Sequence, residues 1–170
     1  MSKVATAVTL KGKPVTLVGT EPEIGKSAPD VTLVANDLSE FKLSSLKGKK
    51  VILSVVPSLD TPVCDLQTKR FNQEAAKLGQ DVKIVTISVD LPFAQKRWCG
   101  LTNSTSIQTL SDYRNGDFGQ AYGVLIQGLK LLTRSIFIVD AEGVLRYKQI
   151  VPEVTQEPNY QEALDALKKI

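Results

Sequence analysis

The sequence predicts an α/β fold with a mixed central sheet flanked by helices, preceded by an N-terminal β-hairpin. Two continuous apolar runs, VILSVVP at 51–57 and VKIVTISVD at 82–90, are too short for helices and rich in β-branched residues, which is typical of strands buried on both faces. Each run precedes a helical stretch, and this order favours parallel strands joined by right-handed crossovers. Two later strands are separated by only three residues, so we expect them to be antiparallel.

The first twenty residues alternate weakly in hydrophobicity. This pattern predicts a β-hairpin of about Val4–Leu10 and Val15–Val18 across a turn that contains Gly12. A loop with two prolines and a glycine follows, and we place it between the hairpin and the rest of the chain. The expected organisation is therefore a hairpin appendage at 1–20 and one domain at 21–170, a length that suits a single hydrophobic core.

The middle of the chain contains one more pair of short strands and two helices. The strands VTLVAN and EFKLSSL flank a polar turn at 36–40. The helix that follows the first buried strand is expected to end at Leu78, with Gly79 as the residue just beyond its last turn. PFAQKRWCGL fits a short helix that begins at Pro92.

The sequence of the C-terminal third predicts two strands and a helix. RSIFIVD and VLRYKQIV are the two strands that we expect to be antiparallel. NYQEALDALKKI predicts a closing helix, because Tyr160, Ala163, Leu164 and Leu167 recur at helical spacing.

Composition argues against nucleic-acid and membrane partners. The 21 basic and 18 acidic residues leave a formal charge of only +3, scattered along the chain, whereas a nucleic-acid site needs a basic stripe with interleaved aromatic residues. No stretch approaches the roughly 20 apolar residues that span a bilayer, and the N-terminus lacks the apolar run of a secretory signal. We therefore expect a cytoplasmic protein.

The cysteine and histidine counts restrict the possible chemistry. The chain has two cysteines, Cys64 and Cys99, and no histidine, so it cannot supply the four nitrogen and sulfur ligands of a structural zinc site. Catalysis that depends on an imidazole base is excluded as well. In the cytosol, paired cysteines are more often catalytic or redox-sensing than permanently bridged. The alternative for Cys64 is an inert buried thiol.

The stretch PSLDTPVC has the features of a helix start around a reactive sulfur. Thr61 is a favourable N-cap and Pro62 a favourable first helical residue, which puts Cys64 in the first turn and on the face turned toward the core. The helix N-terminus favours a thiolate, and the N–H groups of Val63 and Cys64 are free to bind a negatively polarised oxygen. Asp65 opposes this, so an arginine from elsewhere is needed to outweigh its charge.

Pro57, Thr61 and Cys64 form the pattern P-x-x-x-T-x-x-C, which resembles the peroxidatic motif of peroxiredoxins. The segments SVDLPFAQKRWC and TLSDYRNGDFGQAYGV and the hairpin KGKPV resemble the bacterial thiol peroxidase branch in particular, and the similarity runs from about Val8 to Leu167. The resemblance implies a thioredoxin-like fold, a homodimer and catalysis without a metal, flavin or haem.

The resemblance also implies a role for each motif residue. Cys64 matches the cysteine that attacks the distal oxygen of a hydroperoxide and becomes a sulfenic acid. Thr61 matches the hydroxyl that hydrogen-bonds the substrate, although a pure capping role, with its oxygen directed at the Cys64 N–H, is an alternative. Pro57 matches the residue that shields the sulfur from water, and Arg134 the arginine that activates it and holds the peroxide.

Cys99 matches the resolving cysteine of the family. The resemblance implies an internal Cys64–Cys99 disulfide that thioredoxin reduces, whereas its position beside Trp98 on a short helix also fits core packing. Because a disulfide needs Cα atoms within about 7 Å, we hypothesise that the segment 93–101 unfolds locally during turnover.

The predicted function is a thiol-dependent peroxidase that reduces hydrogen peroxide and organic hydroperoxides in antioxidant defence. Two alternatives use the same cysteine pair. A thiol/disulfide oxidoreductase would need two cysteines two residues apart in one helical turn, an arrangement that this chain lacks. A peroxide-responsive redox sensor would be oxidised once and stop, so sustained turnover distinguishes it from a peroxidase.

Overall fold

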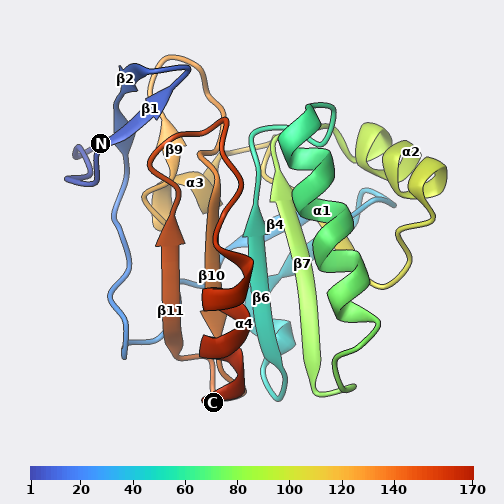
Figure 1. The fold of residues 1–170 in the computed structure, drawn as a ribbon. Coiled ribbons are helices and arrows are strands. Elements are labelled where there is room, and N and C mark those ends of the chain that lie inside the picture. The colour runs from blue at the N-terminus through green and yellow to red at the C-terminus, as the bar shows by residue number, and fades with distance from the viewer.

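A seven-stranded sheet forms the centre of the molecule, and the computed structural model describes all 170 residues (Figure 1). The strand order is β11-β10-β6-β7-β8-β4-β5. The strands are β4 (Thr32–Val34), β5 (Glu40–Lys42), β6 (Lys50–Val55), β7 (Val82–Ser88), β8 (Gln108–Ser111), β10 (Ser135–Val139) and β11 (Leu145–Ile150). β6, β7 and β8 are parallel, whereas β10 runs antiparallel to both β6 and β11. The predicted mixed sheet is therefore confirmed.

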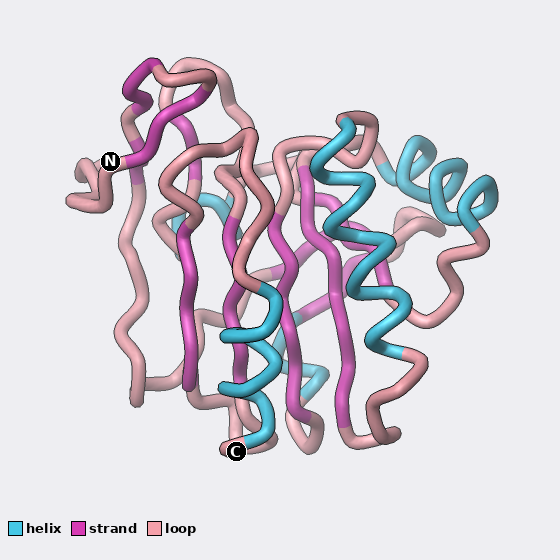
Figure 2. The backbone as a smooth tube through the Cα atoms, viewed as in Figure 1, coloured by secondary structure: helices cyan, strands magenta, loops and turns pink.

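Helices cover both faces of this sheet, as predicted. α1 (Pro62–Ala75) and α4 (Tyr160–Lys168) lie in front of it in Figures 1 and 2, and α3 (Asp117–Ala121) lies behind. Alternate residues of β6 supply the two cores: Ile52 packs on the α1 and α4 side, and Leu53 packs with Phe118 and Tyr122 on the other. α2 (Pro92–Thr102) packs mainly against β8.

The N-terminal hairpin lies where the sequence predicted it, but its second strand differs. β1 (Val8–Leu10) pairs with β2 (Lys13–Val15) across Lys11 and Gly12, whose positive φ angles suit a two-residue hairpin turn. The chain then leaves β1, and β3 (Leu17–Val18) pairs with β9 (Leu125–Ile126) while Val18 also bridges to Lys3. The predicted strand Val15–Val18 is thus divided, because Leu17 and Val18 are buried against another part of the molecule.

Two predicted elements end earlier than expected. EFKLSSL forms only the short strand β5 before turning into a 3₁₀ helix, η1 (Leu43–Leu46), whose Ser44 N–H donates to the Asp30 carboxylate. The first long helix ends at Ala75, and its last turn closes with a bond from the Leu78 N–H to the Glu74 carbonyl. Gly79 has no left-handed backbone, so its predicted role beyond the last turn is wrong.

Three short elements between α2 and β10 were not predicted: β8, α3 and β9. They contain few residues, and strand pairing and side-chain hydrogen bonds hold them in place. The first turn of α3, for example, donates its Phe118 and Gly119 N–H groups to the buried carboxylate of Asp112. Burial raises the pKa of Asp112 to about 6 despite these two donors.

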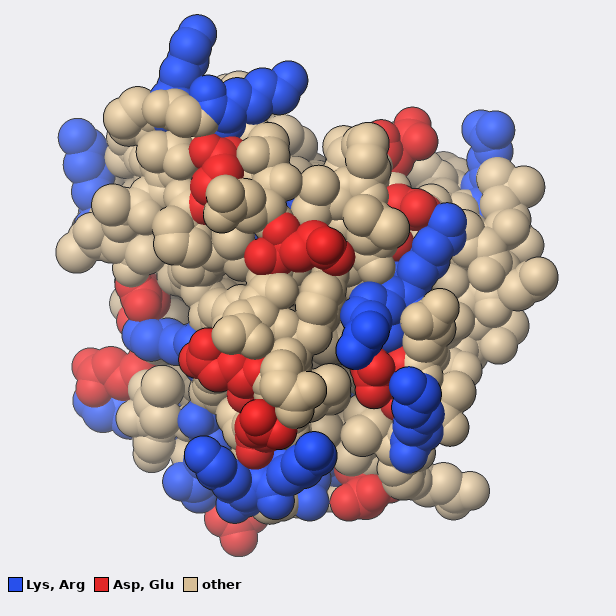
Figure 3. All heavy atoms as spheres, in the orientation of Figure 1, with Lys and Arg blue, Asp and Glu red and all other residues tan.

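Charged side chains of both signs are interspersed over the face shown in Figure 3. This distribution agrees with the predicted mixed-charge surface and shows no basic stripe on that face. None of the helices has both the length and the apolar character required to span a lipid bilayer.

Candidate active site

Cys64 lies in the first turn of α1, directly after the carboxyl end of β6. Thr61 occupies the N-cap with extended backbone angles (φ −133°, ψ 149°) and Pro62 is the first helical residue, as the sequence predicted. The Cys64 side chain is completely buried and packs with Val56 and Leu59, and Trp98 of α2 covers this small cluster. The sulfur is therefore held inside the protein at a helix N-terminus.

Arg134 supplies the positive charge that the sequence required. Its side chain is only 2% exposed, and its Nη2 donates to the Cys64 Sγ at 3.2 Å. The antiparallel register pairs Ser135 with Val55, so the start of β10 lies beside the end of β6 and brings Arg134 to the sulfur. The contact places a fixed positive charge directly against the sulfur.

Gln67 and Val154 hold the guanidinium in place. Arg134 Nη1 donates to Gln67 Oε1 at 2.8 Å, and Arg134 Nε donates to the Val154 carbonyl at 2.8 Å. Gln67 is also fully buried, and its Nε2 donates to the Ser54 Oγ. Sequence reasoning missed Gln67, although a polar residue one turn after Cys64 on the buried face of a helix was a usable signal.

The Thr61 hydroxyl does not cap the helix. Its Oγ1 donates to the Ser58 carbonyl at 3.0 Å, so the alternative capping contact with the Cys64 N–H is not formed. The N–H groups of Val63 and Cys64 accordingly have no acceptor within the protein. Pro57, which is buried, precedes this turn. Two backbone donors and the lone pairs of one hydroxyl are thus available next to the sulfur.

Asp90, which follows β7, anchors the turn that carries Thr61. Its carboxylate accepts hydrogen bonds from Ser58 Oγ, the Leu59 N–H and Ser88 Oγ, each at 2.7 Å. Since Ser58 in turn accepts from Thr61, the Asp90 carboxylate fixes the loop that positions the hydroxyl. Sequence reasoning missed Asp90. A carboxylate at the carboxyl end of a strand neighbouring β6 was the signal that could have found it.

Cys99 lies on α2 in a different environment. It is partly buried, its Sγ contacts Thr109 Oγ1 at 3.6 Å, and burial raises the pKa of its thiol. Both cysteines are free, so the structure represents a state without the Cys64–Cys99 disulfide.

Asp65 does not direct its carboxylate at the sulfur. It accepts a hydrogen bond from Trp98 Nε1 at 3.0 Å and pairs with Lys69 at 2.8 Å. The bond to Trp98 connects α1 with α2, the helix that carries Cys99. The residue that was expected to oppose a thiolate therefore joins the two cysteine helices.

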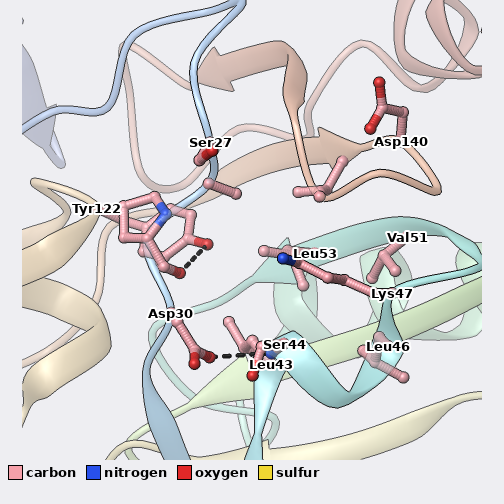
Figure 4. Close-up of a pocket in the computed structure, with 14 residues that line it drawn as sticks. Ser27, Asp30, Leu43, Ser44, Leu46, Lys47, Val51, Leu53, Tyr122 and Asp140 are labelled. Carbon is pink, nitrogen blue, oxygen red and sulfur yellow. Dashed lines mark hydrogen bonds between the residues drawn. The ribbon is translucent and has the colours of Figure 1, made fainter.

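One cavity of the molecule lies away from both cysteines. A cavity of about 260 Å³ on the α3 side of the sheet is lined by Val51, Leu53 and Tyr122, with Asp30 and Lys47 at its edge (Figure 4). Neither cysteine contributes to its lining. No group of three or more acidic or cysteine side chains is placed to hold a metal ion.

Comparison with known proteins identifies the family of this chain. Residues 23–164 match the family described as Redoxin. The chain belongs to the Redoxin family. A thiol peroxidase of Bacillus subtilis is 53% identical over 163 residues, which cover 96% of this chain and 97% of that protein. A thiol peroxidase of Listeria innocua is 51% identical over 164 residues, which cover 96% and 99%. The predicted membership of the bacterial thiol peroxidase branch, with its peroxiredoxin-type peroxidase activity, is confirmed.

Solved structures confirm the thioredoxin-like fold. A peroxiredoxin-like protein from Aquifex aeolicus has a TM-score of 0.90 and 45% identity, and the match covers 97% of each chain. A thiol peroxidase from Chromobacterium violaceum has a TM-score of 0.87 and covers 98% of this chain and 97% of that one, at 22% identity. The second likeness concerns the fold alone, since the identity is low.

Proposed function

We propose that this thiol-dependent peroxidase reduces hydrogen peroxide and organic hydroperoxides through Cys64, that Cys99 resolves the product, and that thioredoxin recycles the disulfide. The contact of 3.2 Å between Arg134 Nη2 and Cys64 Sγ carries the proposal. It places a permanent cation against a buried sulfur in a chain that has no histidine. The thiolate is the nucleophilic form of cysteine, and a guanidinium in contact with the sulfur can pair with its charge.

In the first step the Cys64 thiolate attacks the distal oxygen of the hydroperoxide. A sulfur–oxygen bond forms and the oxygen–oxygen bond breaks. The sulfur gives up two electrons and becomes a sulfenic acid, while the departing oxygen takes up a proton and leaves as water or an alcohol. Arg134 and the free N–H groups of Val63 and Cys64 can stabilise the charge that develops on the oxygens.

Thr61 is placed to orient the substrate. Because its hydrogen is donated to the Ser58 carbonyl, its oxygen can accept a hydrogen bond from the hydroperoxide O–H. Pro57 and the apolar residues Val56 and Leu59 keep bulk water from the sulfur. The site thus orients the peroxide while the thiolate remains poorly solvated.

In the second step the Cys99 sulfur attacks the sulfenic acid. A disulfide forms and water leaves, so a second oxidation to sulfinic acid is avoided. The two cysteines lie on separate helices, and we expect the segment 93–101 to unwind so that they can meet. The weak burial of α2 supports this step: only Pro92 and Gln95 of this helix are buried. A dithiol of thioredoxin then returns two electrons by thiol–disulfide exchange.

The decisive experiment follows NADPH consumption with thioredoxin and thioredoxin reductase. Wild-type protein should turn over continuously, Cys64→Ser should be inactive, and Cys99→Ser should consume one equivalent of peroxide without thioredoxin-supported cycling. Undiminished turnover in Cys64→Ser would disprove the mechanism. A single oxidation of the wild type without cycling would instead indicate the redox sensor.

A separate experiment tests the proposed unwinding of the segment 93–101. Amide hydrogen exchange in 93–101 should be faster in the disulfide form than in the reduced form. Equal protection in the two forms would contradict local unfolding.

We also infer that the protein works in the cytoplasm as a homodimer. Exposed apolar side chains on and beside α2, Leu91, Phe93 and Leu101, support self-association. Sedimentation equilibrium of the reduced protein should give twice the chain mass of 18.5 kDa. A monomer at micromolar concentration would refute the dimer.

A further inference from the structure

The N-terminal hairpin is fastened to the segment that follows β11. The Thr9 N–H donates to the Pro152 carbonyl at 2.8 Å, and the Val154 N–H donates to the Thr9 carbonyl at 2.9 Å. These bonds form a short parallel bridge between Thr9 and Glu153. In Figure 1 the hairpin accordingly lies beside the loop between β11 and α4. Backbone hydrogen bonds therefore join two segments about 140 positions apart in the chain.

The Glu153 carboxylate completes this attachment. It accepts hydrogen bonds from Thr9 Oγ1 at 2.7 Å, the Lys11 N–H at 2.9 Å and the Gly12 N–H at 3.0 Å. Lys11 and Gly12 form the hairpin turn, so one side chain holds both the strand and its turn. The Thr9 hydroxyl and the Gly12 N–H hold the pKa of the Glu153 carboxyl well below its usual range. It is therefore ionised at neutral pH, and its hydrogen bonds are charge-assisted.

Val154 connects this attachment to the active site. Its side chain is buried with Val8 and Leu17 from the N-terminal segment and Ile126 of β9. Its carbonyl accepts the Nε–H of Arg134 at 2.8 Å. The guanidinium that contacts Cys64 thus has its third hydrogen-bond acceptor in the carbonyl of Val154, the residue after Glu153.

We propose that Glu153 is a positioning residue for the peroxidase reaction: by fastening the hairpin to 152–154 it fixes the Val154 carbonyl, and through it the Arg134 guanidinium beside Cys64. This role rests on the proposed function and extends it to the N-terminal hairpin. Glu153 does not touch the reacting atoms. It acts because a guanidinium held at three points keeps its orientation, whereas one that loses an anchor can rotate away from the sulfur.

The test measures the second-order rate constant for oxidation of Cys64 by hydrogen peroxide. Trp98, the only tryptophan, packs on the Cys64 cluster and is a fluorescent reporter for stopped flow. Glu153→Ala should lower the rate constant about tenfold, and Glu153→Gln by less, because Gln keeps one acceptor oxygen. The matched control is Asp140→Ala, since Asp140 closes the turn at the other end of β10 by accepting from two N–H groups and Arg146. It should leave the rate constant unchanged.

A double-mutant cycle separates positioning from general destabilisation. Arg134→Lys removes the Nε–H group that donates to the Val154 carbonyl. In this background, Glu153→Ala should change the rate constant by less than about twofold. Independent, multiplying effects of the two substitutions would overturn the proposal, as would a rate constant in Glu153→Ala equal to that of the wild type.

A second readout does not depend on peroxidase activity. The Nε proton of Arg134, followed by NMR, should exchange with water faster in Glu153→Ala than in the wild type or Asp140→Ala. Unchanged exchange would overturn the link between Glu153 and Arg134. Failure of the proposed function would look different, because the wild-type Cys64 would then not be oxidised by peroxide.

Discussion

Cys64 and Cys99 lie on neighbouring helices that are held to the rest of the protein very differently. Cys64 is fully buried, Arg134 donates to its sulfur, and Thr68 donates to its carbonyl. Cys99 is only partly buried, and its sulfur has one weak contact, to Thr109 at 3.6 Å. The helix of the first cysteine is fixed to the sheet core, whereas the second rests mainly on β8.

This difference corresponds to the two steps of the proposed reaction. The peroxide step needs donors and a cation already in position, because catalysis by fixed charges requires little rearrangement at the moment of reaction. The disulfide step needs one cysteine to travel, and segments that move are drawn from the least stable parts of a structure. The following experiments either enlarge this difference or remove it.

Loss of the cation should have the largest effect. Arg134→Ala removes the group in contact with Cys64 and should lower the rate constant for peroxide by about a thousandfold, the upper range for loss of one donor to a developing charge. Stopped-flow oxidation of Cys64 by hydrogen peroxide measures this rate constant. Arg146→Ala, at the far end of the β10–β11 pair, is the control and should react like the wild type. A loss of less than about tenfold would contradict the role of Arg134.

Asp90→Asn should have the next largest effect. The substitution replaces a carboxylate that accepts three hydrogen bonds and loosens the turn that positions Thr61. We expect the rate constant for peroxide to fall about tenfold, whereas alkylation of Cys64 by iodoacetamide, which does not use Thr61, changes little. In a Thr61→Val background the effect should largely disappear. Equal losses in both reactions would indicate a structural role only.

Trp98→Phe should accelerate the second step. It removes the hydrogen bond from the indole to Asp65, which joins α2 to α1, while keeping an aromatic ring over the Cys64 cluster. If this bond contributes about 1 kcal/mol, disulfide formation should become about fivefold faster in quenched-flow mass spectrometry. Lys69→Met is the control, because it removes the other partner of Asp65 without touching α2. A rate equal to that of the wild type would show that the bond does not restrain α2.

The smallest expected effect concerns how the reactivity of the Cys99 thiol depends on pH. Burial raises the pKa of its thiol, so in Cys64→Ser the folded protein should keep the proton to higher pH than the unfolded chain. Alkylation of Cys99 at pH 8 should therefore be about threefold slower than in urea. As the pH rises above the ordinary pKa of a thiol, the Cys64→Ser protein should lose folding stability relative to a variant that also carries Cys99→Ala. Equal alkylation in both states would show that Cys99 is already accessible.

The predictions that succeeded from sequence depend on short-range rules. Thr61 and Pro62 start a helix because capping and proline geometry act within one turn, and they place Cys64 in that turn. The two buried strands are recognisable because burial on both faces needs continuous apolar residues. The errors occurred where one contact decides an outcome, as at Thr61, whose hydroxyl binds Ser58 instead of the helix.

The residues that complete the site could not be derived in this way. Gln67, Asp90 and Glu153 look like ordinary polar residues until their partners are known. Each partner belongs to another element, and the choice depends on which strands are neighbours and in which register. A difference of one residue in register would direct Arg134 to the other face of the sheet.

By itself, then, the sequence determined the helix start, the buried thiol at its first turn, the absence of an imidazole and the alternation of strands and helices. Only the tertiary structure shows how Arg134, which the family resemblance named, reaches the sulfur 70 positions away and which groups hold it there. The physical reason is that backbone preferences act over a few residues, whereas the antiparallel pairing of Ser135 with Val55 brings distant parts of the chain into contact. The same pairing leaves Arg134 dependent on Val154, and through it on a hairpin at the opposite end of the chain.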